Sequence, residues 1–267
     1  MLEVAGLKEK VEPIIKEAGD ILLSYFKKAR TLKRQKKDGA GFVTEADLAS
    51  EKLLIEKLSQ VVPGADFFAE ESGISGNAEY RWVIDPLDGT TNFAHGFPHF
   101  CISVALANKE RVLFGMIYQP VLQELFWAQA KKGAWLNGDR LQISTPKEFG
   151  EGFLVVSFPY RHSKNGSRET CRKILAHVEK KAFSFRHLGS AALDFASVAS
   201  GRFDGLFAVG LDWWDFAAGG LMIEEAGGKA TTFEGKKLKS DSKTFVAGGA
   251  LMHETIAKLA RECETAV

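Results

Sequence analysis

The residues best suited to chemistry are two aspartates, Asp85 and Asp88, which follow an apolar run and flank Pro86 and Leu87. Proline has a fixed backbone angle φ and restricts the residue before it to extended geometry, so a tight turn here can direct both carboxylates and the Leu87 carbonyl at one point. Hard oxygen ligands of this kind suit magnesium, which usually keeps several waters and shares its coordination with a substrate phosphate. We therefore expect a magnesium site at this point of the chain.

The residues that follow Asp88 are suited to holding an anion. Gly89 lets the backbone approach a ligand closely, and the N–H groups around Thr90 and Thr91 can begin a helix whose positive end attracts a phosphate. Metal and phosphate would then lie side by side. The same D-P-x-D-G sequence is also typical of an ordinary β-turn, so this motif alone leaves both interpretations open.

Further acids occur where secondary-structure elements are expected to begin or end. Glu70 and Glu71 follow a short apolar run, and Asp215 follows two tryptophans at the start of a helical pattern. Asp47 lies at the third position of another predicted helix. Each acid has an ordinary explanation, because carboxylates are common at strand ends and cap helix N-termini.

The elements that must position these acids begin with two helices. Apolar residues recur at three- and four-residue intervals over residues 4–26, which predicts an amphipathic helix that Pro13 should kink or restart. Thr44 and Asp47 form a capping-box pattern ahead of a second helix, which should end at Pro63-Gly64.

Short runs rich in aromatic and β-branched residues predict a set of strands, many joined by hairpins at Asn108-Lys109 and Asn137-Gly138. In the first half they cover residues 66–69, 81–84, 101–107, 112–118 and 124–128. In the second half we expect strands at 153–158, 182–188, 203–209, 229–233 and 244–247, and helices at 167–180, 190–199, 215–226 and 251–261. Residues 1–150 and 151–267 should form two halves that pack tightly as one unit.

Composition indicates an ordinary globular protein. The 267 residues are 45% hydrophobic and 26% charged, and the net charge of +1 favours neither nucleic acid nor a membrane as partner. A cationic run at residues 27–37, which includes Lys36, is typical of a solvated loop. The three cysteines are widely spaced, and we find no uncharged stretch of signal-peptide or membrane-span length, so we expect a reducing, cytoplasmic location.

Taken together, these segments resemble the inositol monophosphatase family in order and spacing, over nearly the whole chain. The D-P-L-D-G-T-T core joined to an upstream E-E-S and a distant W-D is highly specific. The matching segments are Phe42-Val43-Thr44 with Asp47, Phe68-Ala69-Glu70-Glu71-Ser72, the run from Trp82 to Asn92, Gly189-Ser190-Ala191-Ala192, and Trp214-Asp215. The resemblance implies an α/β (α+β) fold, a layered αβαβα sandwich of the sugar phosphatase type with mixed, largely antiparallel sheets, and a homodimer.

The resemblance also implies a role for each matching residue. The first of two to three magnesium ions per subunit would bind Glu70, Asp85 and the Leu87 carbonyl, and the second would bind Asp85, Asp88 and Asp215. A third, more weakly bound ion would be coordinated by the Glu70 carboxylate.

The other implied roles concern the nucleophile and the phosphate. Thr90 and Asp47 would help to deprotonate the attacking water, with Glu70 as the third catalytic residue. Phosphate or substrate contacts are expected at Gly89, Thr90, Ser190, Ala191 and Asp88, and Lys36 is a candidate loop contact.

The function implied by the resemblance is magnesium-dependent hydrolysis of a small phosphate monoester, without a covalent intermediate. Two metal ions can neutralise the phosphoryl oxygens, activate water and stabilise the leaving oxygen. The expected substrate is myo-inositol 1-phosphate, with fructose 1,6-bisphosphate as a second substrate.

One residue departs from the family pattern. Seven residues before Asp215, members that prefer inositol carry a glutamate that binds substrate hydroxyls, whereas this chain has Ala208. A methyl group cannot accept a hydrogen bond, so Asp194, Asp212 and Arg186 become candidates for that contact. Histidinol phosphate, 3′-phosphoadenosine 5′-phosphate and NADP remain open as substrates.

A non-enzymatic alternative is a binding protein of the same fold that is associated with transcription, as one bacterial relative is. The four acids, with Thr90 and Asp47, argue for catalysis, because a pure binding module has no physical need for clustered carboxylates.

Overall fold

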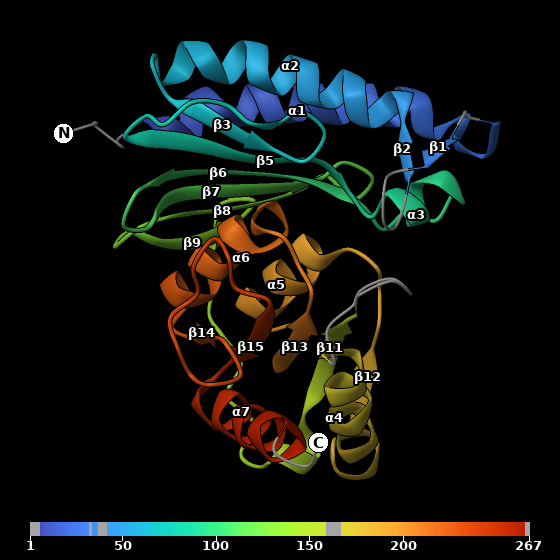
Figure 1. The fold of residues 1–267 in the computed structure, drawn as a ribbon, viewed down its shortest axis with the longest axis vertical. Coiled ribbons are helices and arrows are strands. Elements are labelled where there is room, and N and C mark those ends of the chain that lie inside the picture. Colours follow the sequence, from blue (N-terminus) through green and yellow to red (C-terminus); the bar gives the residue numbers. More distant parts are fainter. Residues whose placement is uncertain (1–5, 32–33, 37–41, 159–166, 265–267) are drawn as a thin grey trace.

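The computed structural model describes residues 6–31, 34–36, 42–158 and 167–264. Within them the elements stack in five layers, helices alternating with sheets (Figure 1). This confirms the layered αβαβα sandwich. From one outer layer to the other, the order is a helix pair, an eight-stranded sheet, a second helix pair, a five-stranded sheet and a third helix pair.

The helix pairs join segments from different parts of the chain. The first consists of α1 (Leu7–Phe26) and α2 (Glu45–Val61), the middle pair of α5 (Ala191–Ala199) and α6 (Trp213–Glu225), and the last of α4 (Ser167–Lys181) and α7 (Ala250–Glu264). A short helix, α3 (Thr90–Ala94), lies beside the hairpin of β1 (Arg34–Lys36) and β2 (Phe42–Thr44).

The eight-stranded sheet is antiparallel except where β3 pairs with β5. In spatial order its strands are β10 (Asp139–Arg140), β9 (Gly133–Leu136), β8 (Glu124–Gln129), β7 (Val112–Gln119), β6 (Cys101–Asn108), β5 (Tyr80–Asp88), β3 (Asp66–Ala69) and β4 (Gly73–Ile74). Asn137 and Gly138, both with positive φ, form the predicted turn between β9 and β10.

The five-stranded sheet is mixed. Its spatial order is β12 (Ser184–Arg186), β11 (Phe153–Ser157), β13 (Gly205–Val209), β15 (Thr244–Gly248) and β14 (Lys229–Thr231). β11 runs parallel to both of its neighbours, and the other pairings are antiparallel.

α1 runs through Pro13 without interruption, so the expected restart of the helix there is wrong. Pro13 lies on the exposed side of the helix, where water can solvate the carbonyl group that loses its partner. The capping box at the start of α2 is present as predicted: Thr44 Oγ1 accepts from Ala46 N, and Asp47 accepts from Thr44 N.

β5 does not end before Asp85, as the sequence suggested, but continues to Asp88. The register on β6 passes from Asp85 opposite Ser103 to Asp88 opposite Cys101, which is a β-bulge. Proline has no N–H to donate within a sheet and is therefore tolerated at bulges. The structure thus places both aspartates on a bulged, buried strand end and not on a β-turn.

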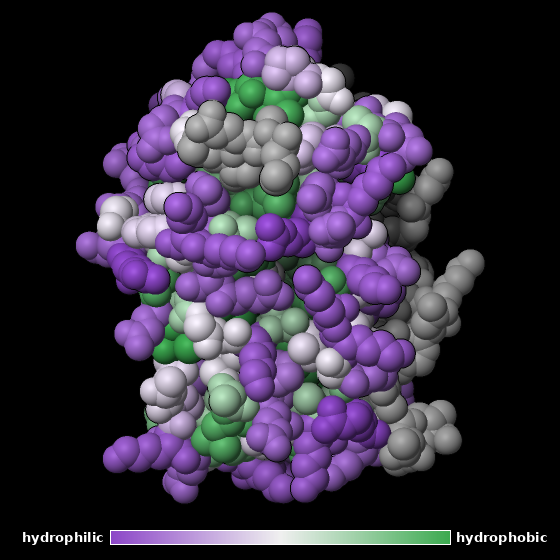
Figure 2. All heavy atoms as spheres, turned by 90° about the vertical axis from the view of Figure 1, so that its left-hand side faces the viewer, coloured by the Kyte–Doolittle hydropathy of each residue, from purple (hydrophilic) through white to green (hydrophobic). Residues whose placement is uncertain are grey.

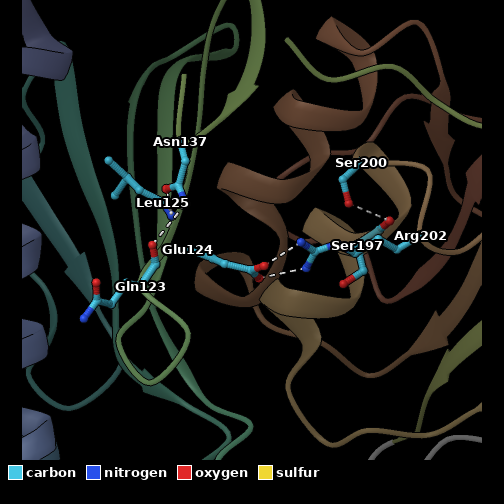
Figure 3. A network of polar contacts seen from close by, with 7 residues as sticks. All are labelled: Gln123, Glu124, Leu125, Asn137, Ser197, Ser200 and Arg202. Carbon is cyan, nitrogen blue, oxygen red and sulfur yellow. Dashed lines mark hydrogen bonds and ion pairs between the residues drawn. The ribbon is translucent and has the colours of Figure 1, made fainter. Parts of the chain in front are cut away.

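Three apolar cores fill the spaces between the layers. Between the first sheet and the middle helices, Glu124 on β8 also forms a two-bonded ion pair with Arg202, which follows α5 (Figure 3). The Arg202 nitrogens lie 2.8 and 2.5 Å from the Glu124 oxygens. The pair ties the eight-stranded sheet to the helices that carry part of the site.

Figure 2 shows one face of the molecule, on which hydrophilic residues predominate and hydrophobic ones form small, separate patches. None of the helices in the described part of the chain combines the length and the apolar character that crossing a membrane requires.

Candidate active site

Three aspartates from two distant segments meet between the first sheet and the middle helix layer. Asp85 and Asp88 come from β5, and Asp215 comes from α6. Each can offer one carboxylate oxygen, and these oxygens lie within 4.8 Å of one another. The tertiary structure therefore brings together the acids that the sequence left far apart.

Glu70 joins this group because β3 runs parallel to β5. Ala69 pairs with Ile84, so Glu70 and Asp85 follow matched positions on neighbouring strands. Glu70 N donates to Ile84 O at 3.1 Å, and the Glu70 side chain is hydrogen-bonded to Asp85.

Burial and mutual repulsion raise the pKa values of Asp85 and Asp215. The pKa of Asp85 is well above its usual value because of burial and the charges of Glu70, Asp88 and Asp215. Burial and the charges of Asp88 and Glu70 likewise raise the pKa of Asp215 well above its usual value. A cation among these oxygens would offset both effects, and an all-oxygen donor set fits magnesium.

Asp88 is held by the N-terminus of α5. Its Oδ2 accepts from Ser190 Oγ at 2.6 Å and from Ala192 N at 2.7 Å, and the Cys101 thiol lies 3.8 Å away. Burial raises the pKa of Asp88 to about 6, while the bonds from Ser190 and Ala192 act in the opposite direction. The carboxylate is therefore fixed in direction before any ligand arrives.

Asp47 and Asp215 share one local geometry. Each is the third residue of a helix, and its Oδ2 accepts the backbone N–H of the N-cap residue. Asp47 accepts from Thr44 N at 2.9 Å, and Asp215 accepts from Asp212 N at 2.7 Å. The capping role is thus real for both. α6 begins two residues earlier than predicted, so its N-cap is Asp212 and not Asp215.

Asp47 also faces Thr90. Thr90 Oγ1 lies 3.2 Å from Asp47 Oδ1 and 3.0 Å from the Leu87 carbonyl, and its single hydrogen can be donated to either oxygen. The pair implied by the resemblance therefore has hydrogen-bond geometry in this structure.

Gly89 connects β5 to α3 in the left-handed region, with φ of +90°. A Cβ atom here would lie 2.9 Å from the His99 carbonyl oxygen. The backbone can therefore make this close turn only because residue 89 has no side chain.

The remaining expected contacts lie as follows. Ser190 is buried and its hydroxyl is engaged by Asp88, and Ala191 begins α5. Lys36 lies on β1, but its side chain lies outside what the structure describes. Ala208 is fully buried on β13.

Asp194, Asp212 and Arg186 are the candidates for the substrate-hydroxyl contact that Ala208 cannot make. Asp194 is fully buried, and its Oδ2 accepts from Ser157 Oγ at 2.6 Å. Asp212 is exposed and forms an ion pair with Lys243. Arg186 lies over the Phe153 ring. Each has a structural role in this fold.

Two buried polar residues on α2 are not among the predicted site residues: Ser50, whose hydroxyl donates to Pro86 O, and Glu51, which accepts from Glu71 N. The sequence does contain a signal for them, because Ser50 and Glu51 precede Leu54 by four and three residues and therefore lie on the same face of the helix as Leu54 and Leu58. Polar residues within an apolar helical stripe indicate a specific contact inside the protein.

Comparison with known proteins shows which family this chain is similar to. The model of the inositol monophosphatase family matches residues 7–265. An inositol-1-monophosphatase of Rhizobium meliloti is 38% identical and covers 98% of this chain and 97% of its own. A Nus factor SuhB of Pseudomonas aeruginosa is 37% identical, over 87% of this chain and 88% of its own length.

Solved structures show the same fold. The extragenic suppressor protein suhB of Bartonella henselae superimposes with a TM-score of 0.91 at 32% identity, covering 97% of this chain and 99% of its own. The Thermotoga maritima IMPase gives a TM-score of 0.85 at 31% identity, over 95% and 96% of the two chains.

Proposed function

This chain belongs to the inositol monophosphatase family, whose members are metal-dependent phosphatases, and we propose that it hydrolyses small phosphate monoesters with magnesium. Two to three ions per subunit would be held by Glu70, Asp85, Asp88, Asp215 and the Leu87 carbonyl. The observation that carries the proposal is the convergence of Asp85, Asp88 and Asp215 within 4.8 Å.

The buried Asp85 and Asp88, together with the half-buried Glu70 and Asp215, fit a cation-binding site better than a structural one. Protons on buried, mutually repelling acids are replaced readily by a divalent ion, since the ion compensates several charges at once. When bound, magnesium would supply positive charge to the phosphate oxygens and Lewis acidity for the attack of water.

The chain's own groups would orient the reactants. Thr90 Oγ1 can donate its hydrogen to Asp47 Oδ1, at 3.2 Å, so Thr90 could take a proton from the attacking water while its own hydroxyl proton passes to the Asp47 carboxylate. The N–H groups of Gly89 and Thr90 would contact the phosphate, and Ser190 and Ala191 are the other proposed contacts.

The leaving group is proposed to be a polyol or a sugar, with myo-inositol 1-phosphate first and fructose 1,6-bisphosphate second. Inositol-1-monophosphatases of Rhizobium meliloti and Caulobacter vibrioides are 38% and 39% identical to this chain. Because Ala208 offers no hydrogen-bond acceptor, we expect weak discrimination among polyol phosphates. Histidinol phosphate and nucleotides are the alternatives.

A second candidate function is a binding role in transcription. It is favoured by the relatives named Nus factor SuhB, which are 37% to 39% identical over 87% of this chain. The two roles differ in their need for the acids, because only hydrolysis requires the charges of Asp88 and its neighbours.

The test measures phosphate released from a panel of inositol 1-phosphate, fructose 1,6-bisphosphate, histidinol phosphate and 3′-phosphoadenosine 5′-phosphate, with and without magnesium. Asp88→Asn should abolish turnover, while Asp139→Asn, which removes an exposed acid from β10, should not. A parent that releases no phosphate from any of them, or an Asp88→Asn variant as fast as the parent, would contradict the proposal.

We also propose that the protein acts in the cytoplasm as a homodimer and that its two halves, 1–150 and 151–267, unfold together. The three cysteines are buried and free, which suits a reducing compartment. Light scattering on the purified protein measures its mass, and a single calorimetric transition checks joint unfolding.

A further inference from the structure

We propose that two residues of α2, Ser50 and Glu51, are positioning residues that aim the metal ligands without touching metal or substrate. The inference rests on the proposed function, because it assigns these side chains to the same metal site. The observation behind the inference is that one face of α2 contacts three separate segments of that site, at Glu71, Pro86 and Thr90.

This face continues the apolar stripe that holds α2 on the first sheet. Asp47, Ser50, Glu51, Leu54 and Leu58 follow one another at intervals of three, one, three and four residues, and all are buried, with exposures between 0% and 4%. Spacings of three and four place side chains on the same side of a helix. The far half of this face is apolar, whereas the half nearest the site is polar.

Glu51 holds the backbone on one side of Glu70. Glu51 Oε2 accepts from Glu71 N at 2.9 Å, and Glu70 N donates to Ile84 O at 3.1 Å. The two peptide groups that flank the Cα atom of Glu70 are therefore both anchored, one to α2 and the other to β5. The direction in which the Glu70 side chain leaves the backbone is set by these two bonds.

Ser50 holds the bulge of β5 in the same way. Its hydroxyl donates to Pro86 O at 2.9 Å, while the N–H of the same peptide group, on Leu87, donates to Asp85 Oδ1 at 3.1 Å. The peptide plane between Pro86 and Leu87 is thus anchored at both ends. Through it, Ser50 fixes the orientation of the Asp85 carboxylate.

Asp47 completes the arrangement through its bond to Thr90. One rigid helix therefore sets three parts of the site: the Glu70 turn, the bulge at Asp85 and the hydroxyl of Thr90. Outer partners of metal ligands commonly change metal affinity by 10- to 100-fold when they are removed. α2 therefore acts as a common frame for these three parts of the site.

The test measures Mn²⁺ binding to the metal-free protein by electron paramagnetic resonance of the free ion, which needs no turnover. Glu51→Ala should raise the Kd for Mn²⁺ about tenfold. Glu51→Gln should restore most of the affinity, because an amide oxygen can accept the same N–H bond. Ser50→Ala should raise the Kd by a smaller factor, about threefold. At saturating magnesium, kcat should stay within about twofold of the parent.

Two controls on the same helix separate positioning from general damage. Glu56→Ala removes an acid from the exposed side and should leave both Kd and thermal stability unchanged. Leu54→Ala removes a buried side chain and should lower Tm without a change in the Kd of the folded fraction.

The outcomes are distinguishable. A parent that binds no Mn²⁺ would overturn the proposed function together with this inference. A parent that binds Mn²⁺, with Glu51→Ala binding it equally well while Asp88→Asn does not, would overturn the positioning role alone. Equal losses for Glu51→Ala and Glu51→Gln would also contradict it, since only the hydrogen bond is restored by glutamine.

Discussion

The hydroxyl of Ser190 donates to Asp88 Oδ2 at 2.6 Å, across 102 residues of sequence. The bond links the start of the middle helix layer to the bulged end of β5, and it lies entirely inside the protein. A carboxylate that must hold a cation in one place gains direction from such a partner.

Ser190→Ala should weaken divalent-cation binding about tenfold, because Asp88 Oδ2 then loses its shortest hydrogen bond and keeps those from Ala192 N and the Cys101 thiol. Titration of the metal-free protein with Mg²⁺ in a calorimeter measures this. The matched control is Ser200→Ala, which removes a hydroxyl bonded to Ser197 O at the other end of α5 (Figure 3) and should leave the affinity unchanged. Equal affinities for the parent and Ser190→Ala would show that this bond does not orient the ligand.

The raised pKa of Asp88 predicts a pH dependence of stability without metal. An acid with a folded pKa of about 6, above its usual value of 3.8, stabilises the fold at low pH and loses that contribution as the pH rises through 6. Between pH 5 and 7 the parent should lose about 1 kcal/mol of unfolding free energy relative to Asp88→Asn.

Urea unfolding of both proteins in EDTA measures this difference, and the comparison cancels the histidines, of which His99 and His253 have pKa values lowered by burial. Magnesium should reverse the trend, since it binds the ionised acid. A difference that does not change with pH would mean that Asp88 carries no shifted proton in the metal-free fold.

Gly89→Ala should impair both folding and turnover. The new Cβ atom would lie 2.9 Å from the His99 carbonyl, at a φ of +90°. Gly64→Ala is the matched control, because Gly64 has a φ of +82° and open space around it. It should cost about 1 kcal/mol from strain alone, whereas Gly89→Ala should cost more and lower kcat. Chemical denaturation and phosphate release measure the two effects, and equal costs for both variants would rule out the close approach as the cause.

Thr90 and Asp47 should act as a unit. Thr90→Val and Asp47→Asn should each lower kcat by about 10², and the double variant should be no slower than the worse single one, because the second change removes a contact already lost. The side-chain oxygen of asparagine can still accept the N–H of Thr44, the N-cap residue, so α2 should keep its stability. Thr90→Ser serves as the control that retains the hydroxyl. Losses that multiply in the double variant would show that the residues act independently.

The amino-acid sequence determined the local features of this protein. The helical periodicity, the capping box of Thr44 and Asp47, the turn at Asn137-Gly138 and the acid-rich motif at Asp85 all depend on neighbours a few residues apart. Each is decided by backbone sterics and short hydrogen bonds, which is why the capping box and the Asn137-Gly138 turn are correct in the structure, whereas the helix restart at Pro13 and the tight turn at Asp85 are not.

Only the tertiary structure decided which distant groups meet. The extension of β5 to Asp88 depends on its register with β6, and the bonds from Ser190 to Asp88 and from Glu51 to Glu71 N depend on how helices pack on the sheet. Such contacts are set by strand pairing and by burial summed over whole layers. A short stretch of sequence does not determine these long-range contacts, so the positioning of the acids by α2 could be recognised only in the folded chain.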